Sequence, residues 1–110
     1  MDKLLKKILN ASGISGYEGE IAGIMKDELK RSCDEVHIDN FGNVIARKGK
    51  GRKKIMVCAH MDEIGLVVKH ITKEGYLYFI KMGGIDDRIL PGQRVLVKAK
   101  SGDILGIIGS

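Results

Sequence analysis

A short helix is predicted near the N-terminus, where apolar residues recur at helical spacing. Its apolar stripe consists of Leu4, Leu5, Ile8 and Leu9. We expect this helix to end at Ser12-Gly13, because glycine suits a helix C-terminus. A second stripe, which predicts a longer helix ending near Arg31, consists of Ile21, Ile24, Met25 and Leu29. The stretch "SGYE" (Ser15 to Glu18) has the spacing of a capping box and is expected to open this second helix.

Short apolar runs separated by turn formers follow from residue 35 onward and predict strands. "EVHID" and "VIAR" flank the turn-rich "NFGN" (Asn40 to Asn43), which indicates a hairpin. "KIMVCA" (Lys54 to Ala59) is a continuous apolar run, as expected for a central strand buried on both faces. The remaining expected strands are, in chain order, "IGLVVKHI", "YLYFI", "QRVLVKA" and "ILGII".

This order of elements divides the chain into two parts. Residues 1–69 mix helix and strand, which favours part of a layered α/β domain. Residues 70–110 contain only short strands and glycine turns, which favours the start of a small β-barrel or sandwich. Because "ILGIIGS" stops inside or directly after a strand, we do not expect such a barrel to be complete by residue 110.

Composition fits a globular domain or part of one, since the 110 residues are 44% hydrophobic and 30% charged. No apolar run is long enough to span a bilayer. Lys6 and Lys7 interrupt the N-terminal apolar stretch, so it does not resemble a signal peptide, and we expect a cytoplasmic protein. Cys33 and Cys58 do not have the spacing of a metal pair and are expected to be free thiols.

The net charge of +5 raises the possibility of a nucleic-acid partner. Much of the excess lies in "RKGKGRKK" (Arg47 to Lys54), which can bind phosphates but is more typical of a solvated turn. An alternative function is therefore a small β-barrel that binds nucleic acid, or a structural interaction module with open strand edges. Three tyrosines and two phenylalanines are the only aromatic residues, so stacking platforms are scarce and nucleic-acid binding is not favoured.

The stretch "VCAHMDEIGLVV" (Val57 to Val68) places ionisable side chains between two apolar runs. On an extended strand, residues two apart point the same way, so His60 and Asp62 share a face, with Cys58 beside them. A metal-binding histidine usually donates its second ring N–H to a carboxylate, and Asp62 is well placed to accept it. The position at the carboxyl end of a strand also favours a functional site.

The same pattern has a simpler interpretation, in which His60 and Asp62 form a hydrogen-bonded pair without a metal. A catalytic zinc site typically needs three protein ligands and an open position, which one histidine and one aspartate do not supply. The other histidines, His37 and His70, are expected to face solvent or to pack against neighbours. The residues alone leave both interpretations open.

Five stretches in order resemble the M42 family of metalloaminopeptidases: "SGISGYE", "DNFGNVIARKGKG", "KIMVCAHMDEIGLVV", "GYLYFIKMGG" and "LPGQRVLV". The resemblance covers essentially all 110 residues, and "AHMDEIG" is its most specific element. It implies an α/β/α zinc-peptidase catalytic domain, interrupted near Lys69 to Thr72 by a β-barrel-like dimerisation domain. Residues 1–69 would then belong to the first domain and residues 70–110 to the second.

The resemblance also implies roles for individual residues. His60 matches a ligand to one of two divalent metal ions, zinc or cobalt, and Asp62 matches the family's catalytic aspartate; Glu63 receives no ligand role. The implied reaction is hydrolysis of N-terminal residues from peptide substrates by a metal-activated water. The implied assembly is a cytoplasmic homo-oligomer in which dimers form a dodecamer, with no membrane partner. Since family members are several times longer, the chain resembles the N-terminal portion, and we expect it to be inactive alone.

Overall fold

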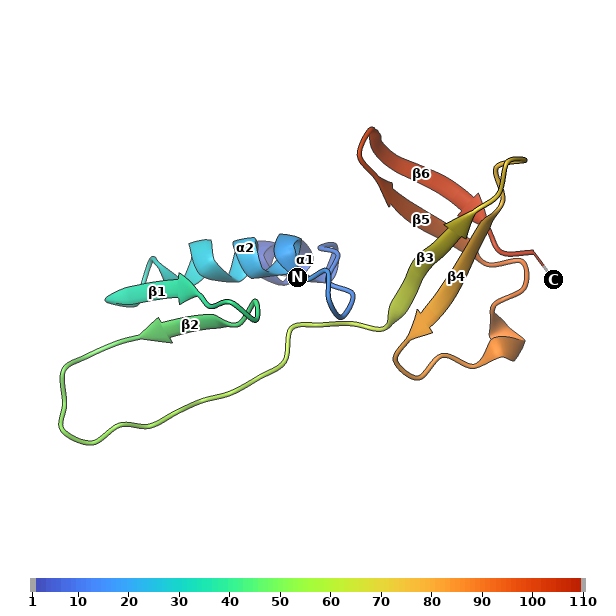
Figure 1. Ribbon diagram of the computed structural model, residues 1–110. Coiled ribbons are helices and arrows are strands. Elements are labelled where there is room, and N and C mark those ends of the chain that lie inside the picture. Colours follow the sequence, from blue (N-terminus) through green and yellow to red (C-terminus); the bar gives the residue numbers. More distant parts are fainter. Residues whose placement is uncertain (1, 110) are drawn as a thin grey trace.

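The structure, a computed structural model, describes residues 2–109, which form two lobes joined by extended chain (Figure 1). The molecule measures 59 × 28 × 24 Å and has a radius of gyration of 17.7 Å. A compact domain of this length has a radius of gyration of about 13 Å. Only Ile21, Ala22 and Ile108 are buried apolar residues in the part of the chain described. Residues 2–109 therefore form small packed units and no large shared core.

The N-terminal lobe packs two helices on one side of a hairpin (Figure 1). Its elements are α1 (Lys3–Leu9), α2 (Gly19–Leu29), β1 (Glu35–Ile38) and β2 (Val44–Arg47). Asp2 caps α1, since its carboxylate accepts a hydrogen bond from the Leu4 N–H at 3.0 Å. The predicted helices and this hairpin are confirmed, although α1 ends a few residues earlier than expected.

The expected capping box at the start of α2 is wrong. The helix begins at Gly19, and its N-cap residue Glu18 makes no side-chain capping hydrogen bond. Its carboxylate instead accepts from the Gly16 N–H at 2.6 Å. The Ser15 hydroxyl donates to Asp62, which lies 47 positions further along the chain. The Ser15 side chain is thus bonded to a distant carboxylate and not to a backbone N–H at the start of α2.

The expected central strand "KIMVCA" is not a strand in this structure. Residues 48–62 run as an extended segment along the molecule without ladder pairing (Figure 1). The side chains of Ile55, Met56 and Val57 are 91%, 86% and 90% exposed. A strand needs a neighbour to bond its N–H and C=O groups, and none lies alongside this segment among the described residues. His60 therefore lies near the end of an extended segment and not at the end of a strand in a sheet.

The C-terminal lobe consists of two antiparallel hairpins and a short 3-10 turn. Its elements are β3 (Gly65–Ile71), β4 (Leu77–Met82), the turn η1 (Asp87–Ile89), β5 (Arg94–Ala99) and β6 (Gly102–Ile107). These four strands were all predicted from the apolar pattern. Every sheet within residues 2–109 has two strands, so neither a parallel sheet nor a closed barrel is formed there. The division expected at residues 69 and 70 stays a prediction; β3 runs across it.

The two lobes meet where the loop after α1 pairs with the residues before β3. Ile14 and Glu63 form a parallel bridge, and the Glu63 N–H donates to the Gly13 carbonyl at 2.7 Å. An ion pair between Lys98 of β5 and Glu20 of α2, 3.7 Å apart, also links the two lobes. The bridge holds the candidate site, which begins at residue 60, directly at this junction. Between residues 2 and 109, the longest apolar helical stretch is too short for a membrane-crossing helix.

Candidate functional site

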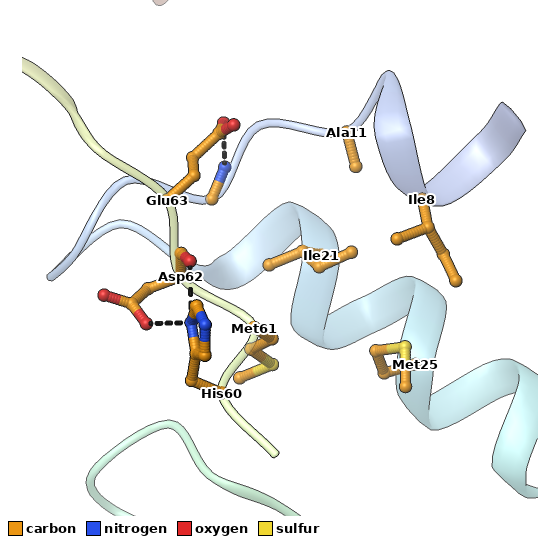
Figure 2. A pocket seen from close by; sticks show the side chains of 9 residues that line it. Ile8, Ala11, Ile21, Met25, His60, Met61, Asp62 and Glu63 are labelled. Carbon is orange, nitrogen blue, oxygen red and sulfur yellow. Dashed lines mark hydrogen bonds and ion pairs between the residues drawn. The ribbon is translucent and has the colours of Figure 1, made fainter. Parts of the chain in front are cut away.

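His60 is hydrogen-bonded to Asp62 through one of its two ring nitrogens. Its Nδ1 lies 3.0 Å from Asp62 Oδ1 and 3.1 Å from the Asp62 backbone carbonyl oxygen (Figure 2). Because both atoms are acceptors, Nδ1 must carry the ring hydrogen and donate it. In the neutral form of the ring this leaves the lone pair on Nε2, and the His60 side chain is 85% exposed. This is the tautomer in which histidine can bind a cation through Nε2.

Asp62 is bonded at both oxygens of its carboxylate. Oδ1 faces His60, while Oδ2 accepts a hydrogen bond from the Ser15 hydroxyl at 2.5 Å. The Ser15 hydrogen bond, followed by the His60 hydrogen bond, lowers the pKa of the Asp62 carboxyl below its ordinary value. Asp62 is therefore ionised at neutral pH and presents a negative charge to the imidazole.

The Glu63 side chain contacts the backbone of Gly13 and not the His60 side chain. Its Oε1 accepts from the Gly13 N–H at 3.1 Å, and its own N–H bonds the Gly13 carbonyl (Figure 2). Gly13 permits this approach because a Cβ there would lie 2.7 Å from Ile21 Cγ2 and 3.3 Å from the Met61 carbonyl oxygen. Glu63 thus fastens the segment that carries His60 and Asp62 to the loop after α1.

An apolar recess of about 290 Å³ lies beside this pair, between α1 and α2. Figure 2 shows Met61 on the side of Ile21 and Met25, with the His60–Asp62 pair next to it. Met61 alternates with His60 and Asp62 along extended chain, as the two-residue period requires. Packing of Met61 into the recess helps to set the direction of its two polar neighbours.

The structure brings some of the predicted residues together and leaves others apart. His60 and Asp62 meet as expected, whereas Cys58 is exposed on the extended segment. His37 lies in β1, and His70 in β3 has its ring centroid 6.3 Å from that of Tyr78. No three histidine, cysteine, aspartate or glutamate side chains converge on a metal position within residues 2–109.

His60 and Asp62 fit one part of a metal site. Nε2 of His60 has no hydrogen-bond partner among residues 2–109, and a charged carboxylate bonds Nδ1, which is the usual arrangement of a histidine that binds a cation. A complete set of three or more ligands is not formed by the described residues.

Ser15 and Gly13 are site residues that the pattern of apolar and polar positions did not identify. Ser15 was assigned to a helix cap, and Gly13 to a helix end, because only local spacing was visible. The proximity of "SGISGYE" to "AHMDEIG" is a tertiary property. Within the sequence itself, no signal at short range links the two stretches.

The profile of the M42 glutamyl aminopeptidase family matches residues 42–110 of the chain. The chain is 44% identical over 108 residues to the lysyl aminopeptidase of Pyrococcus furiosus, an alignment that covers 97% of the chain and 31% of that relative. Similarity to the family therefore extends well beyond the one motif around His60.

Solved structures show the same likeness. A TET aminopeptidase from a marine sediment Thaumarchaeota archaeon superposes with a TM-score of 0.89 at 41% identity, covering 98% of this chain and 31% of that one. The TET1 peptidase of Pyrococcus horikoshii, described as assembling into a tetrahedron or a large octahedral shell, gives a TM-score of 0.86 at 44% identity, with 98% and 32% covered. The chain spans about a third of the length of the relatives that it matches.

Proposed function

Because the chain belongs to the M42 glutamyl aminopeptidase family, we propose that it forms the N-terminal part of a metal-dependent aminopeptidase. The enzyme would hydrolyse N-terminal residues from peptides. The observation that carries the proposal is the His60–Asp62 pair, which lies inside the matched residues and leaves His60 Nε2 free. The relatives named above are aminopeptidases or peptidases, and this supports the same class of substrate here.

His60 would serve as a ligand to one of two divalent metal ions, zinc or cobalt. Its exposed side chain and its donating Nδ1 support this role. Bound divalent ions supply Lewis acidity, which polarises a peptide carbonyl and activates water for attack. His60 would contribute its Nε2 to that centre, with Nδ1 bonded to Asp62.

Asp62 would be the catalytic aspartate, acting on His60. Its negative charge keeps the hydrogen on Nδ1 and increases the electron density that Nε2 can donate. The Ser15 hydrogen bond supports the charged form of Asp62, since it lowers the pKa of this carboxyl. No other ligand role is proposed within residues 2–109, where Glu63 is bonded to Gly13.

The architecture of the complete enzyme would follow the family. Residues 1–69 would contribute to an α/β/α catalytic domain, and residues 70–110 would begin a β-rich dimerisation domain. The apolar side chains of Ile55, Met56 and Val57 are exposed, which supports the assignment of this segment to a larger catalytic domain. Further parts of that domain would cover these side chains. Subunits would assemble as dimers into a dodecamer in the cytoplasm, an expectation supported by the shells that the Pyrococcus horikoshii relative forms.

The nucleic-acid alternative is not proposed. Arg47 is engaged with Glu35 at 2.6 Å, and the rest of the basic run lies on the exposed extended segment. Those positions fit the solvated turn that is more typical of such a basic run.

The proposal is tested by the His60→Ala substitution in the full-length protein. We expect loss of one metal ion per subunit, measured by elemental analysis, and nearly complete loss of hydrolysis of leucyl and glutamyl p-nitroanilides. His37→Ala is the matched control, because His37 lies in β1 and its side chain makes no hydrogen bond or ion pair with His60 or Asp62. Residues 1–110, assayed alongside with added zinc or cobalt, should be inactive. Unchanged metal content in His60→Ala would contradict the proposed ligand role.

A further inference from the structure

The Ser15 hydroxyl makes a contact that its local sequence does not require. It donates to Asp62 Oδ2 at 2.5 Å, and both groups are partly buried. A capping serine would instead accept a hydrogen bond from a backbone N–H at the start of α2, and no such bond is made. Ser15 is thus engaged with the carboxylate that orients His60.

This bond restrains the plane of the Asp62 carboxylate. The terminal torsion of an aspartate is broad, so a carboxylate held by one partner can rotate. Here Oδ1 is held against His60 Nδ1 at 3.0 Å, and Oδ2 is held by Ser15. With both oxygens engaged, rotation would break one bond or the other. The direction of the imidazole, and of its Nε2, is restrained in turn.

Backbone pairing places the hydroxyl where this contact can form. The parallel bridge between Ile14 and Glu63 sets residue 13 opposite residue 62 and residue 15 opposite residue 64. Residues 15 and 62 are then diagonal neighbours, whose side chains lie on the same side of the paired segments. On the other side of Ser15, the Tyr17 N–H donates to the Ile14 carbonyl at 2.7 Å and closes a turn. Ser15 therefore reaches Asp62 from a backbone that is fixed on both sides, which makes the contact a built feature of the junction.

We propose that Ser15 is a positioning residue for the metal site, acting through the Asp62 carboxylate to hold His60 in its ligand orientation. The proposal rests on the proposed function. Groups that orient a metal ligand through a hydrogen bond typically change metal affinity or activity by about 10–100-fold when removed. Because Ser15 is one step further from the metal than Asp62, we expect an effect near the lower end, about 10-fold.

The test uses the full-length protein with Ser15→Ala, Ser15→Thr and Ser15→Cys. Threonine keeps the hydroxyl donor, while cysteine keeps the volume but donates weakly. Ser12→Ala is the control, since the Ser12 hydroxyl makes no side-chain hydrogen bond within residues 2–109. Calorimetric titration of the metal-free protein with Zn²⁺ measures affinity, and kcat and KM are measured on leucyl p-nitroanilide. Thermal unfolding shows whether each variant folds.

Ser15→Ala and Ser15→Cys should weaken one Zn²⁺ site about 10-fold and lower kcat with little change in KM. Ser15→Thr should retain the wild-type Zn²⁺ affinity and kcat, and Ser12→Ala should match the wild type in both. In an Asp62→Asn background, Ser15→Ala should have no further effect, because the two act as a unit. Zn²⁺ affinity and kcat of Ser15→Cys equal to wild type would overturn the proposal, even if Ser15→Ala failed to fold. Failure of the proposed function is distinct: the wild type itself would then bind no Zn²⁺.

Discussion

Replacing Gly13 by alanine should loosen the junction that carries the candidate site. The added Cβ would lie 2.7 Å from Ile21 Cγ2, which is about 0.8 Å closer than an ordinary carbon contact of about 3.5 Å. Ile21 is only 4% exposed and has little room to move away. The Met61 carbonyl oxygen, 3.3 Å away, closes the other side. Overpacking of this kind costs about 1–3 kcal/mol, so we expect the free energy of unfolding to fall by that amount.

The measurement is urea unfolding of the full-length protein, combined with amide hydrogen exchange at Glu63, whose N–H bonds the Gly13 carbonyl. Exchange at Glu63 should accelerate in Gly13→Ala, because the shifted backbone weakens that bond. Gly23→Ala is the matched control: Gly23 lies inside α2 with nothing within 4 Å of an added Cβ. There alanine should stabilise by about 0.5–1 kcal/mol, since glycine is unfavourable in a helix interior.

A double-mutant cycle identifies the cause of the loss. Ile21→Ala removes the Cγ2 atom that the new Cβ would meet, so Gly13→Ala should be much less damaging in that background. The reasoning is refuted if Gly13→Ala is as stable as wild type with unchanged Glu63 exchange. It is equally refuted if the two substitutions add independently, because the clash would then not involve Ile21.

Two further substitutions give separate outcomes. Asp62→Asn should lower turnover by about 10–100-fold while reducing metal occupancy less, because an amide accepts a hydrogen bond but offers no charge; wild-type kcat, measured beside the metal content, would show that the carboxylate is structural only. Asp39→Asn should destabilise the β1–β2 turn, because the Asp39 carboxylate accepts from the Phe41 and Asn43 N–H groups and from Asn43 Nδ2, each at 2.9 Å. These bonds, the Asn43 side chain first, lower the Asp39 pKa in the folded protein, so its contribution is present above the ordinary aspartate pKa and is lost as the pH falls through the folded value. The difference in urea midpoint between wild type and Asp39→Asn should therefore shrink on acidification, and a pH-independent difference would contradict this account.

Local periodicity by itself determined the short-range structure of this protein. Helical stripes located α1 and α2, apolar runs between turn formers located the six strands, and the turn-rich Asn40 to Asn43 indicated the first hairpin. The spacing of His60 and Asp62 was also informative, because side chains two apart on extended chain lie on one side whether or not the chain joins a sheet. These properties depend on neighbours within a few residues, which is why the sequence contains them.

Only the tertiary structure decided what those elements meet. The apolar run Lys54 to Ala59 has the composition of a buried strand, yet strand formation needs a partner, and the described residues offer it none. Ser15 has the spacing of a helix cap, yet its hydroxyl bonds Asp62 once the bridge between Ile14 and Glu63 brings the two together. Hydrogen-bond donors go to the acceptors that the folded chain places within reach, and contacts 47 positions apart are not encoded in local spacing.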